Sequence, residues 1–232
     1  MIKAKIKRML DRKKQIKELK FQKNIQKECI DKEDIERVKI ENSKQIDEVR
    51  KELIKDLECE LKVFDEDKQI KIFQWINAWI YYLFYEEIFD SSKLRTYKRG
   101  DIVHVNFGFN VHNELGGTHY AIVIEADNSP TSGCVTVVPL RSEDSEEEVL
   151  KNMHERTEVY LGSGIICFGR GKDKYTVAKV NQIRAIDKMR ILKPKNDKSD
   201  IVYPIDKNVR NDILNKIDKK IIELFTKPQK NA

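Results

Sequence analysis

The chain has 232 residues, of which 40% are hydrophobic and 36% charged, and its net charge is +6. This length fits one or two domains, and the high charged fraction indicates that part of the chain lacks a core of its own. Four widely spaced cysteines with no Cys-x-x-Cys pair argue against a zinc knuckle or a disulfide framework and favour a reducing cytoplasm. The basic N-terminus lacks the continuous apolar segment of a signal peptide. Charged and amide side chains interrupt the most apolar stretch, residues 70–89, so no membrane span is predicted.

Glycine and proline divide the chain into two parts. All nine glycines and all five prolines lie between Gly100 and Pro228, so residues 1–96 favour helix and residues 97–232 favour turns. Eleven Lys or Arg against two acids give residues 1–27 a charge of +9, while residues 28–96 carry −6 and residues 97–232 carry +3. The basic arm could attract phosphate backbones, although a solvated helix face explains its charge equally well.

The helical part begins with an amphipathic pattern. Apolar residues spaced by three or four positions predict one helix with a single apolar face: Ile46, Val49, Leu53, Leu57, Leu61 and Phe64. Ile35 and Val38 extend this stripe backwards. A single rod of 60 residues would be about 90 Å long. A break near Asn42-Ser43, or pairing with a second copy, is the more reasonable arrangement.

A second helix follows with a different character. Asp65, Glu66 and Asp67 favour a helix start, because side chains of this kind cap the first turn and complement its dipole. Residues 70–89 are apolar nearly all round and include Trp75 and Trp79. Such a helix should be buried against the β domain, the preceding helix or another subunit.

The second part of the chain has the period of strands. Residues 101–107 alternate, with Ile102, His104 and Asn106 on one face and Val103, Val105 and Phe107 on the other. Further strands are predicted at 120–126, 135–140, 157–161 and 175–180, with an acidic loop at 142–148. A C-terminal amphipathic helix is predicted over 206–225, with five residues on its buried face: Val209, Ile213, Ile217, Ile221 and Leu224. The pattern predicts an α+β fold with a small antiparallel β barrel.

One loop of this part carries groups suited to proton or phosphate chemistry. Gly116 and Gly117 stand directly before the apolar run 120–124, and glycine allows close approach of another backbone or a ligand. His112, Glu114 and His119 lie within eight positions of each other. An ordinary hairpin turn explains the two glycines equally well.

Three segments together resemble the PemK/MazF family of toxin endoribonucleases. Residues 97–103, Tyr-Lys-Arg-Gly-Asp-Ile-Val, are similar to the family's opening strand. Residues 114–124 are similar to its Glu-x-Gly-Gly-x-Arg-Pro loop and following strand. Residues 181–191, Asn-Gln-Ile-Arg-Ala-Ile-Asp-Lys-Met-Arg-Ile, are close to its Gln-Ile-Arg-Thr-Ile-Asp-Lys signature. The segments occur in the family's order over about 97–226, and residues 1–96 lie outside the resemblance.

The resemblance implies a compact SH3-like barrel, a homodimer, a cognate antitoxin partner and no cofactor or metal. It also implies cleavage of single-stranded RNA, in which a ribose 2′-OH attacks the adjacent phosphate. The products are a cyclic phosphate and a 5′-OH. Such an enzyme must move protons and stabilise charge on the phosphate, but it needs no nucleophilic side chain because the RNA supplies the hydroxyl.

Carrying the family's site onto this chain gives three catalytic candidates. The arginine after Gly-Gly-x falls on His119, and the Thr or Ser that ends the third strand falls on Arg141 or Ser142. Histidine can act as base or acid near neutrality, so His119 could shuttle the proton while Arg141 holds the phosphate and Ser142 binds a phosphate oxygen. Asn181 cannot be a general base. The expected RNA-binding residues are His112, Glu114, Gly116, Gly117, Thr118, Lys179 and Arg184.

Other functions remain open at this point. The same barrel could be a binding module that holds RNA or a protein but does not cleave, because the family's arginine is replaced. The helices could instead organise a DNA-binding regulatory dimer. The extension, residues 1–96, could serve dimerisation as a coiled coil or helical hairpin. Its acidic, aromatic segment 28–96 could also inhibit the barrel in cis.

Overall fold

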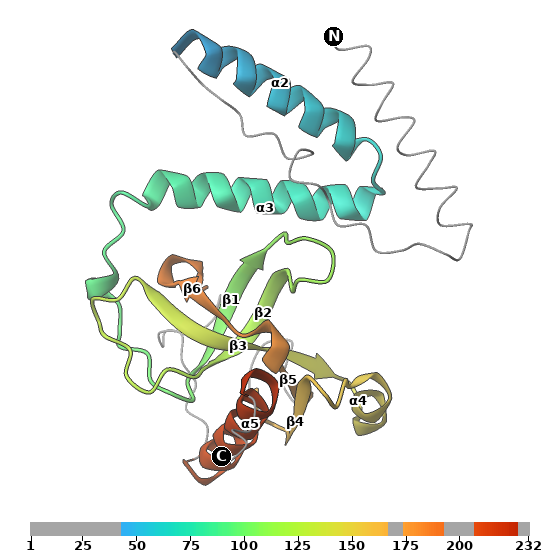
Figure 1. The fold of residues 1–232 in the computed structure, drawn as a ribbon, viewed down its shortest axis with the longest axis vertical. Helices are drawn as coiled ribbons and strands as arrows, with labels where there is room; N and C mark the ends of the chain where they lie inside the picture. The colour runs from blue at the N-terminus through green and yellow to red at the C-terminus, as the bar shows by residue number, and fades with distance from the viewer. Residues whose placement is uncertain (1–42, 167–173, 193–206, 227–232) are drawn as a thin grey trace, which may run out of the picture. The chain divides into compact units, whose positions relative to one another are not determined.

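The computed structural model describes residues 43–166, 174–192 and 207–226 (Figure 1). The chain divides into two compact units, of which the first ends at Val63 and the second begins at Phe64. The predicted basic arm, residues 1–27, and the stripe positions Ile35 and Val38 lie outside the described residues. No helix in the described ranges is long and apolar enough to cross a membrane.

Helix α2, Ser43–Leu61, is the helix that the apolar stripe predicts. Leu61 is buried, but Ile46, Leu53 and Leu57 are each 44–54% exposed. The amphipathic pattern therefore identifies the helix correctly, while most of its apolar face stays open to solvent.

Helix α3, Glu66–Tyr85, belongs to the second unit and starts as predicted. Asp65 is its N-cap, and the Asp65 side chain accepts a hydrogen bond from the backbone N–H of Lys68 at 2.8 Å. Glu66 and Asp67 lie in the first turn, where the helix dipole favours them. The helix is expected to be buried against the β domain, the preceding helix or another subunit, and within this single chain Ile72 is the one buried residue of α3. The 3₁₀ turn η2, Ser91–Lys93, follows it.

Six antiparallel strands form the sheet of the second unit, which confirms the predicted α+β class. The strands are β1 (Ile102–Gly108), β2 (Gly117–Val123), β3 (Cys134–Glu143), β4 (Glu158–Ser163), β5 (Tyr175–Lys179) and β6 (Arg184–Asp187). Their order is β1-β2-β3-β5-β4, and β6 pairs with the first half of β3. The long strand β3 is therefore shared, since β2 and β6 pair along its first part and β5 along its last four residues. A bridge between Val105 and Ile191 joins the end of the sheet to β1.

The strands bury two apolar clusters, as the alternation of β1 predicts. Val103, Val105 and Phe107 belong to one cluster, and Ile102 belongs to the other. Helix α5, Lys207–Phe225, covers the second cluster with Ile213, Leu214 and Ile217. Of its predicted buried face, Ile221 and Leu224 are partly buried, but Val209 is 44% exposed and Asp206 lies outside the described residues. The helix is therefore anchored by its middle turns.

Two predicted boundaries are wrong. The acidic segment 142–148 is not a loop, because β3 continues to Glu143 and the short helix α4 occupies Glu146–Asn152. The Ser145 side chain caps α4 by accepting from the Glu148 N–H at 3.2 Å. Strand β2 starts at Gly117, before the apolar run on which the prediction was based. β6 follows the 3₁₀ turn η4, Val180–Gln182, and precedes η5, Lys188–Arg190; it was not predicted.

Candidate functional site

The glycine loop between β1 and β2 is held closed by tight backbone contacts. A Cβ atom on Gly116 would lie 2.7 Å from the carbonyl oxygen of Gly108, and Gly117 has a φ of +79°. Both positions therefore suit glycine for a physical reason. The Asn110 amide donates to the carbonyl of Phe107 at 3.1 Å and to the carbonyl of Leu115 at 2.6 Å. The loop is a defined structure that presents the start of β2.

Gln182 and Arg184 connect this loop to the segment that contains η4 and the start of β6. The Gln182 Oε1 atom accepts from the Leu115 N–H at 3.1 Å and from Arg184 Nη2 at 2.9 Å. The Arg184 guanidinium also lies over the Phe107 ring, 5.4 Å from its centroid. These contacts bring the glycine loop and the segment 181–191 together, two of the three segments that the sequence singles out.

His119 lies half-buried in β2 at the inner end of the loop. Its Nε2 atom is 3.0 Å from the Gly116 carbonyl oxygen, and its ring is 6.4 Å from that of Phe107. Burial lowers the pKa of His119 and the positive charge of Lys179 lowers it further, while hydrogen bonds with the Gly116 and Leu140 backbone oppose this. The lowered pKa favours the neutral imidazole at pH 7.

Arg141 and Ser142 lie on opposite faces of β3. The β2–β3 ladder ends at Ala121 and Pro139, and the last four residues of β3 pair with β5, with Arg141 opposite Val177. Side chains alternate along a strand, so Ser142 lies on the face of Leu140 and Arg141 on the other. Lys179 shares the Arg141 face, because it is two residues from Val177 in β5. The charge of Lys179 lowers the pKa of His119, so of the two candidates Arg141 shares its face with a cation that acts on the histidine.

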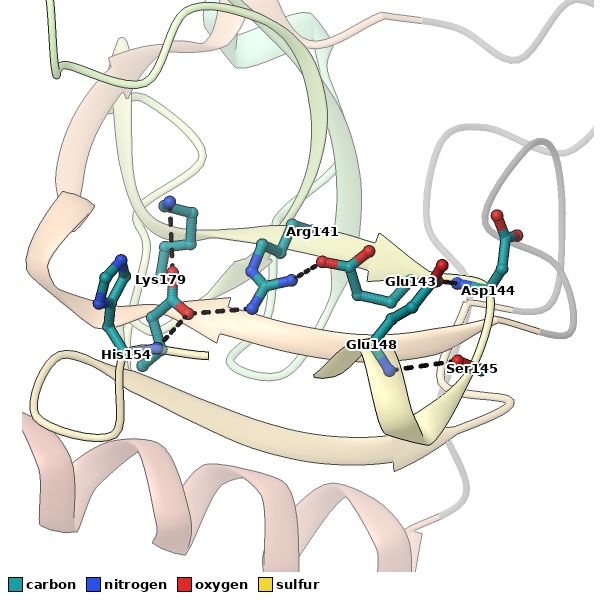
Figure 2. A network of polar contacts seen from close by, with 8 residues as sticks. Arg141, Glu143, Asp144, Ser145, Glu148, His154 and Lys179 are labelled. Atoms are coloured by element: carbon teal, nitrogen blue, oxygen red, sulfur yellow. Dashed lines mark hydrogen bonds and ion pairs between the residues drawn. The ribbon is translucent and has the colours of Figure 1, made fainter. Parts of the chain in front are cut away.

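A compact ion-pair cluster surrounds Arg141 (Figure 2). Its two terminal nitrogens contact the carboxylates of Glu143 and Glu158, the second at 3.1 Å. Lys179 Nζ lies 3.2 Å from the other oxygen of Glu158. The His154 backbone N–H donates to Glu158 as well, at 3.1 Å. Two cations and two carboxylates therefore balance each other, and Arg141 is not a free phosphate ligand as it stands.

Glu158 is the centre of this cluster, and its side chain is only 2% exposed. Burial by itself raises the pKa of Glu158, but the His154 N–H, Arg141 and Lys179 together hold it below its usual value. The carboxylate is therefore ionised at neutral pH and binds its two cations in place. Cross-strand pairing explains one contact, since Glu158 and Lys179 are opposite each other in the β4–β5 ladder.

The remaining predicted residues lie at the surface of the loop. His112, Glu114 and Thr118 are exposed, and His112 has a left-handed φ of +46°. The Glu114 backbone N–H closes a turn by donating to the Val111 carbonyl at 3.0 Å. These three side chains border the glycine loop in the region of His119, where an extended polar ligand can reach them.

Glu158 and Gln182 are important residues that sequence reasoning missed. Gln182 stands within the segment that carried the resemblance, yet its contact with the Leu115 N–H depends on the fold. A signal for Glu158 existed in the strand period, because it shares one face with Tyr160 in a predicted strand. Its inward direction and its partners follow from pairing with β5, which the strand itself does not reveal.

Helix α3 borders the same end of the sheet. The side chain of Trp75 lies at Gly108, where an added Cβ would be 2.8 Å from the indole, and the Arg190 guanidinium is 5.2 Å from the indole centroid. Arg190 donates to the carbonyls of Asn106 and Phe107 at 2.9 and 2.7 Å. The Asn106 amide in turn donates to the Tyr82 hydroxyl at 3.1 Å. These contacts fix one face of α3 to the edge where the glycine loop begins.

Within residues 43–166, 174–192 and 207–226, no group of three or more His, Cys, Asp or Glu side chains is arranged to hold a metal ion.

Comparison with known proteins gives one family and one similar structure. Residues 98–225, more than half of the chain, match the family described as the PemK-like, MazF-like toxin of type II toxin–antitoxin systems. Among solved structures, the chain is similar to the crystal structure of MazF (Form-I) from Deinococcus radiodurans, with 18% sequence identity and a TM-score of 0.37. That similarity covers 56% of this chain and 97% of the other. A search of curated proteins finds no match.

Proposed function

The chain belongs to the PemK-like, MazF-like toxin family of type II toxin–antitoxin systems, and we propose that residues 97–232 form an endoribonuclease that cuts single-stranded RNA without a metal ion. One observation carries this proposal beyond the family. His119 contacts the Gly116 carbonyl of the glycine loop at 3.0 Å, and burial together with the charge of Lys179 lowers its pKa and so favours the neutral imidazole. A neutral imidazole near positive charge is what proton removal next to a phosphate requires.

In the proposed reaction the RNA attacks itself. His119 takes the proton from a ribose 2′-OH, and the resulting oxygen forms a bond to the adjacent phosphorus. The bond from phosphorus to the 5′ oxygen breaks, and that oxygen leaves with a proton drawn from water. The products are a 2′,3′-cyclic phosphate and a 5′-OH end. DNA lacks the attacking hydroxyl, so it is not cut.

Arg141 and Lys179 have a defined role in this scheme, which is to stabilise negative charge on the phosphate. Arg141 contacts Glu143 and Glu158, and these differ in exposure, at 22% and 2% of the side chain. A phosphate therefore competes with the more accessible Glu143, while Glu158 keeps the guanidinium in place. Ser142 lies on the other face of the sheet, so its assignment has less support than that of Arg141.

Binding of the RNA chain falls to the residues around the loop. We propose that Arg184 and the exposed side chains of His112, Glu114 and Thr118 contact the strand, with Gly116 and Gly117 allowing its close approach. Arg184 contributes a positive charge whose described hydrogen bonds go to the carbonyl and amide oxygens of Gln182. It can therefore attract phosphates without first breaking an ion pair. Membership of the family also implies a cognate antitoxin, and we propose a homodimer as the working form.

A non-cleaving binding module is the second candidate, and one observation favours it. Arg141 is neutralised by two carboxylates and His119 replaces the family's arginine, so the barrel could hold RNA without activating it. A DNA-binding regulator organised by the helices differs from both, since it requires duplex binding and no RNA cleavage.

The test is cleavage of a mixed single-stranded RNA in EDTA, with analysis of both ends of the products. We expect 5′-OH and cyclic phosphate ends, and a loss of about 10³-fold in rate for His119→Ala. His154→Ala is the matched control, because that side chain is exposed and only its backbone N–H contacts Glu158. RNA that binds but stays intact would support the binding module instead. Duplex DNA binding without RNA cleavage would support the regulator.

A further inference from the structure

Helix α3 has two apolar faces, and one of them contacts the sheet. On that face Trp75 packs at Gly108 and Arg190, and the Tyr82 hydroxyl accepts from Asn106. At 100° per residue, positions 75 and 82 lie on one side of the helix. The opposite side is therefore directed away from the sheet.

That opposite side is apolar and exposed. We define the open face of α3 as Ile70, Phe73, Asn77, Ile80, Tyr81 and Phe84, which are all exposed. Its five apolar members are between 50% and 72% exposed, and Phe84 is the most exposed of them. A helix with apolar residues nearly all round is stable in water only when a partner covers its second face.

The area of the open face suits a specific interface. Side chains of this size bury about 150–250 Å² each, so five of them at these exposures offer roughly 600 Å² per copy. Two such faces together would bury about 1,200 Å², which is at the lower end for specific complexes. Ring contacts of Tyr85 with Tyr81 at 4.4 Å and with Phe84 at 5.0 Å already order the aromatic end.

The spacing of the open face is that of a helix-pairing seam. Ile70, Phe73, Asn77, Ile80 and Phe84 are separated by 3, 4, 3 and 4 positions, the repeat of a heptad core. Asn77 occupies the central position. A side-chain amide has both a donor and an acceptor, so two asparagines brought together by two-fold symmetry satisfy each other. A single buried asparagine in such a seam sets its register.

We propose that the open face of α3 pairs with the same face of a second copy of this chain, with the two Asn77 side chains in contact on the two-fold axis. The amide of Asn77 argues for this occupant, because a two-fold axis brings each amide against its own counterpart, donor to acceptor. This contact lies on the helix face directed away from the sheet, and it does not depend on RNA cleavage.

The first test measures the mass of the full chain by sedimentation at tens of micromolar. Phe84→Glu introduces a charge into the seam at an exposed site, so the monomer fold is retained and circular dichroism should be unchanged. We expect the mass of the assembly to fall by half. Leu150→Glu on α4 is the matched control, because Leu150 is 69% exposed and remote from α3 in sequence. An assembly mass that Phe84→Glu leaves unchanged would overturn the proposal.

The second test identifies the occupant directly by cysteine cross-linking. Asn77→Cys should give a covalent dimer under mild oxidation, well above the background set by the four native cysteines of the unsubstituted chain. No increase over that background would overturn the proposal. An efficient cross-link within one chain between Leu53→Cys and Ile80→Cys, with a monomeric mass, would also overturn it by assigning the open face to α2.

Discussion

Two basic regions at neighbouring places in the sheet handle charge in different ways. Around Glu158, the cations of Arg141 and Lys179 meet carboxylates, and the group is electrically balanced. Around Phe107, by contrast, the described hydrogen bonds of Arg184 and Arg190 go to carbonyl and amide oxygens. The first arrangement suits a brace that holds strands β3, β4 and β5 together. The second uses its guanidinium groups as hydrogen-bond donors to oxygens of the fold, and we propose that Arg184 also attracts the phosphates of RNA.

The brace can be tested by removing its central charge. Glu158→Gln leaves Arg141 and Lys179 without their buried counter-ion, and we expect a loss of about 2–3 kcal/mol in the free energy of unfolding in urea. The low pKa of Glu158 adds a pH signature, because its stabilisation is present above its ordinary value of 4.5 and is lost as the pH falls through the lower folded value. The variant should therefore lose less stability on acidification than the parent chain.

Asp144→Asn is the control for this experiment. Its ion pair with Lys174 has a carboxylate side chain that is 76% exposed, so its removal should change the free energy of unfolding by less than about 0.5 kcal/mol. If both variants lose the same free energy of unfolding, Glu158 does not stabilise the packing of β3, β4 and β5 more than an exposed ion pair would.

The second prediction concerns the loop that joins the two regions. Gly116→Ala sets a methyl group 2.7 Å from the backbone oxygen of Gly108, so the loop must shift. Because His119 contacts the Gly116 carbonyl, we expect kcat/KM for RNA cleavage to fall about tenfold. Gly133→Ala should have no such effect, because nothing lies within 4 Å of its added methyl group. If Gly116→Ala leaves the rate of RNA cleavage unchanged, the conformation of the glycine loop does not affect catalysis.

A third, smaller effect is expected from the region of open charge. Arg184→Gln should weaken the binding of single-stranded RNA about fivefold, and the slope of log K against log salt should become shallower by roughly 0.7. Arg156→Gln removes the same charge from an exposed arginine elsewhere in the domain, so it should change the slope less. If both variants have the same slope, RNA does not contact Arg184 specifically.

Much of the fold could be predicted from local pattern. The cap at Asp65 and the alternation of β1 are short-range features, and the structure contains both. β6 was missed because its four residues pair only with β3, a distant segment. The open face of α3 was missed for the opposite reason, since composition alone indicates burial and cannot say which side a neighbour covers.

The candidate site was less accessible to sequence reasoning. The resemblance identified His119 and Arg184 as candidates. In the fold their segments are in contact, because Gln182 accepts a hydrogen bond from Leu115 and Arg184 lies over the Phe107 ring. It could not reveal that Arg141 is bound by Glu143 and Glu158, because ion pairs between strands depend on register. The choice between Arg141 and Ser142 likewise needed the β3–β5 ladder, since a shift of one residue exchanges their faces.

The most direct test of the account compares the titration of His119 with the pH dependence of cleavage. NMR of the imidazole gives its pKa, and log kcat/KM in EDTA gives the acid limb of the reaction. Burial lowers the pKa of His119 from its ordinary value of 6.5, so the neutral base persists to more acidic pH. We predict that the imidazole titrates below 6.5 and that cleavage declines with the same midpoint. A midpoint for cleavage that differs from the titration of His119 would contradict the assignment of this histidine as the base.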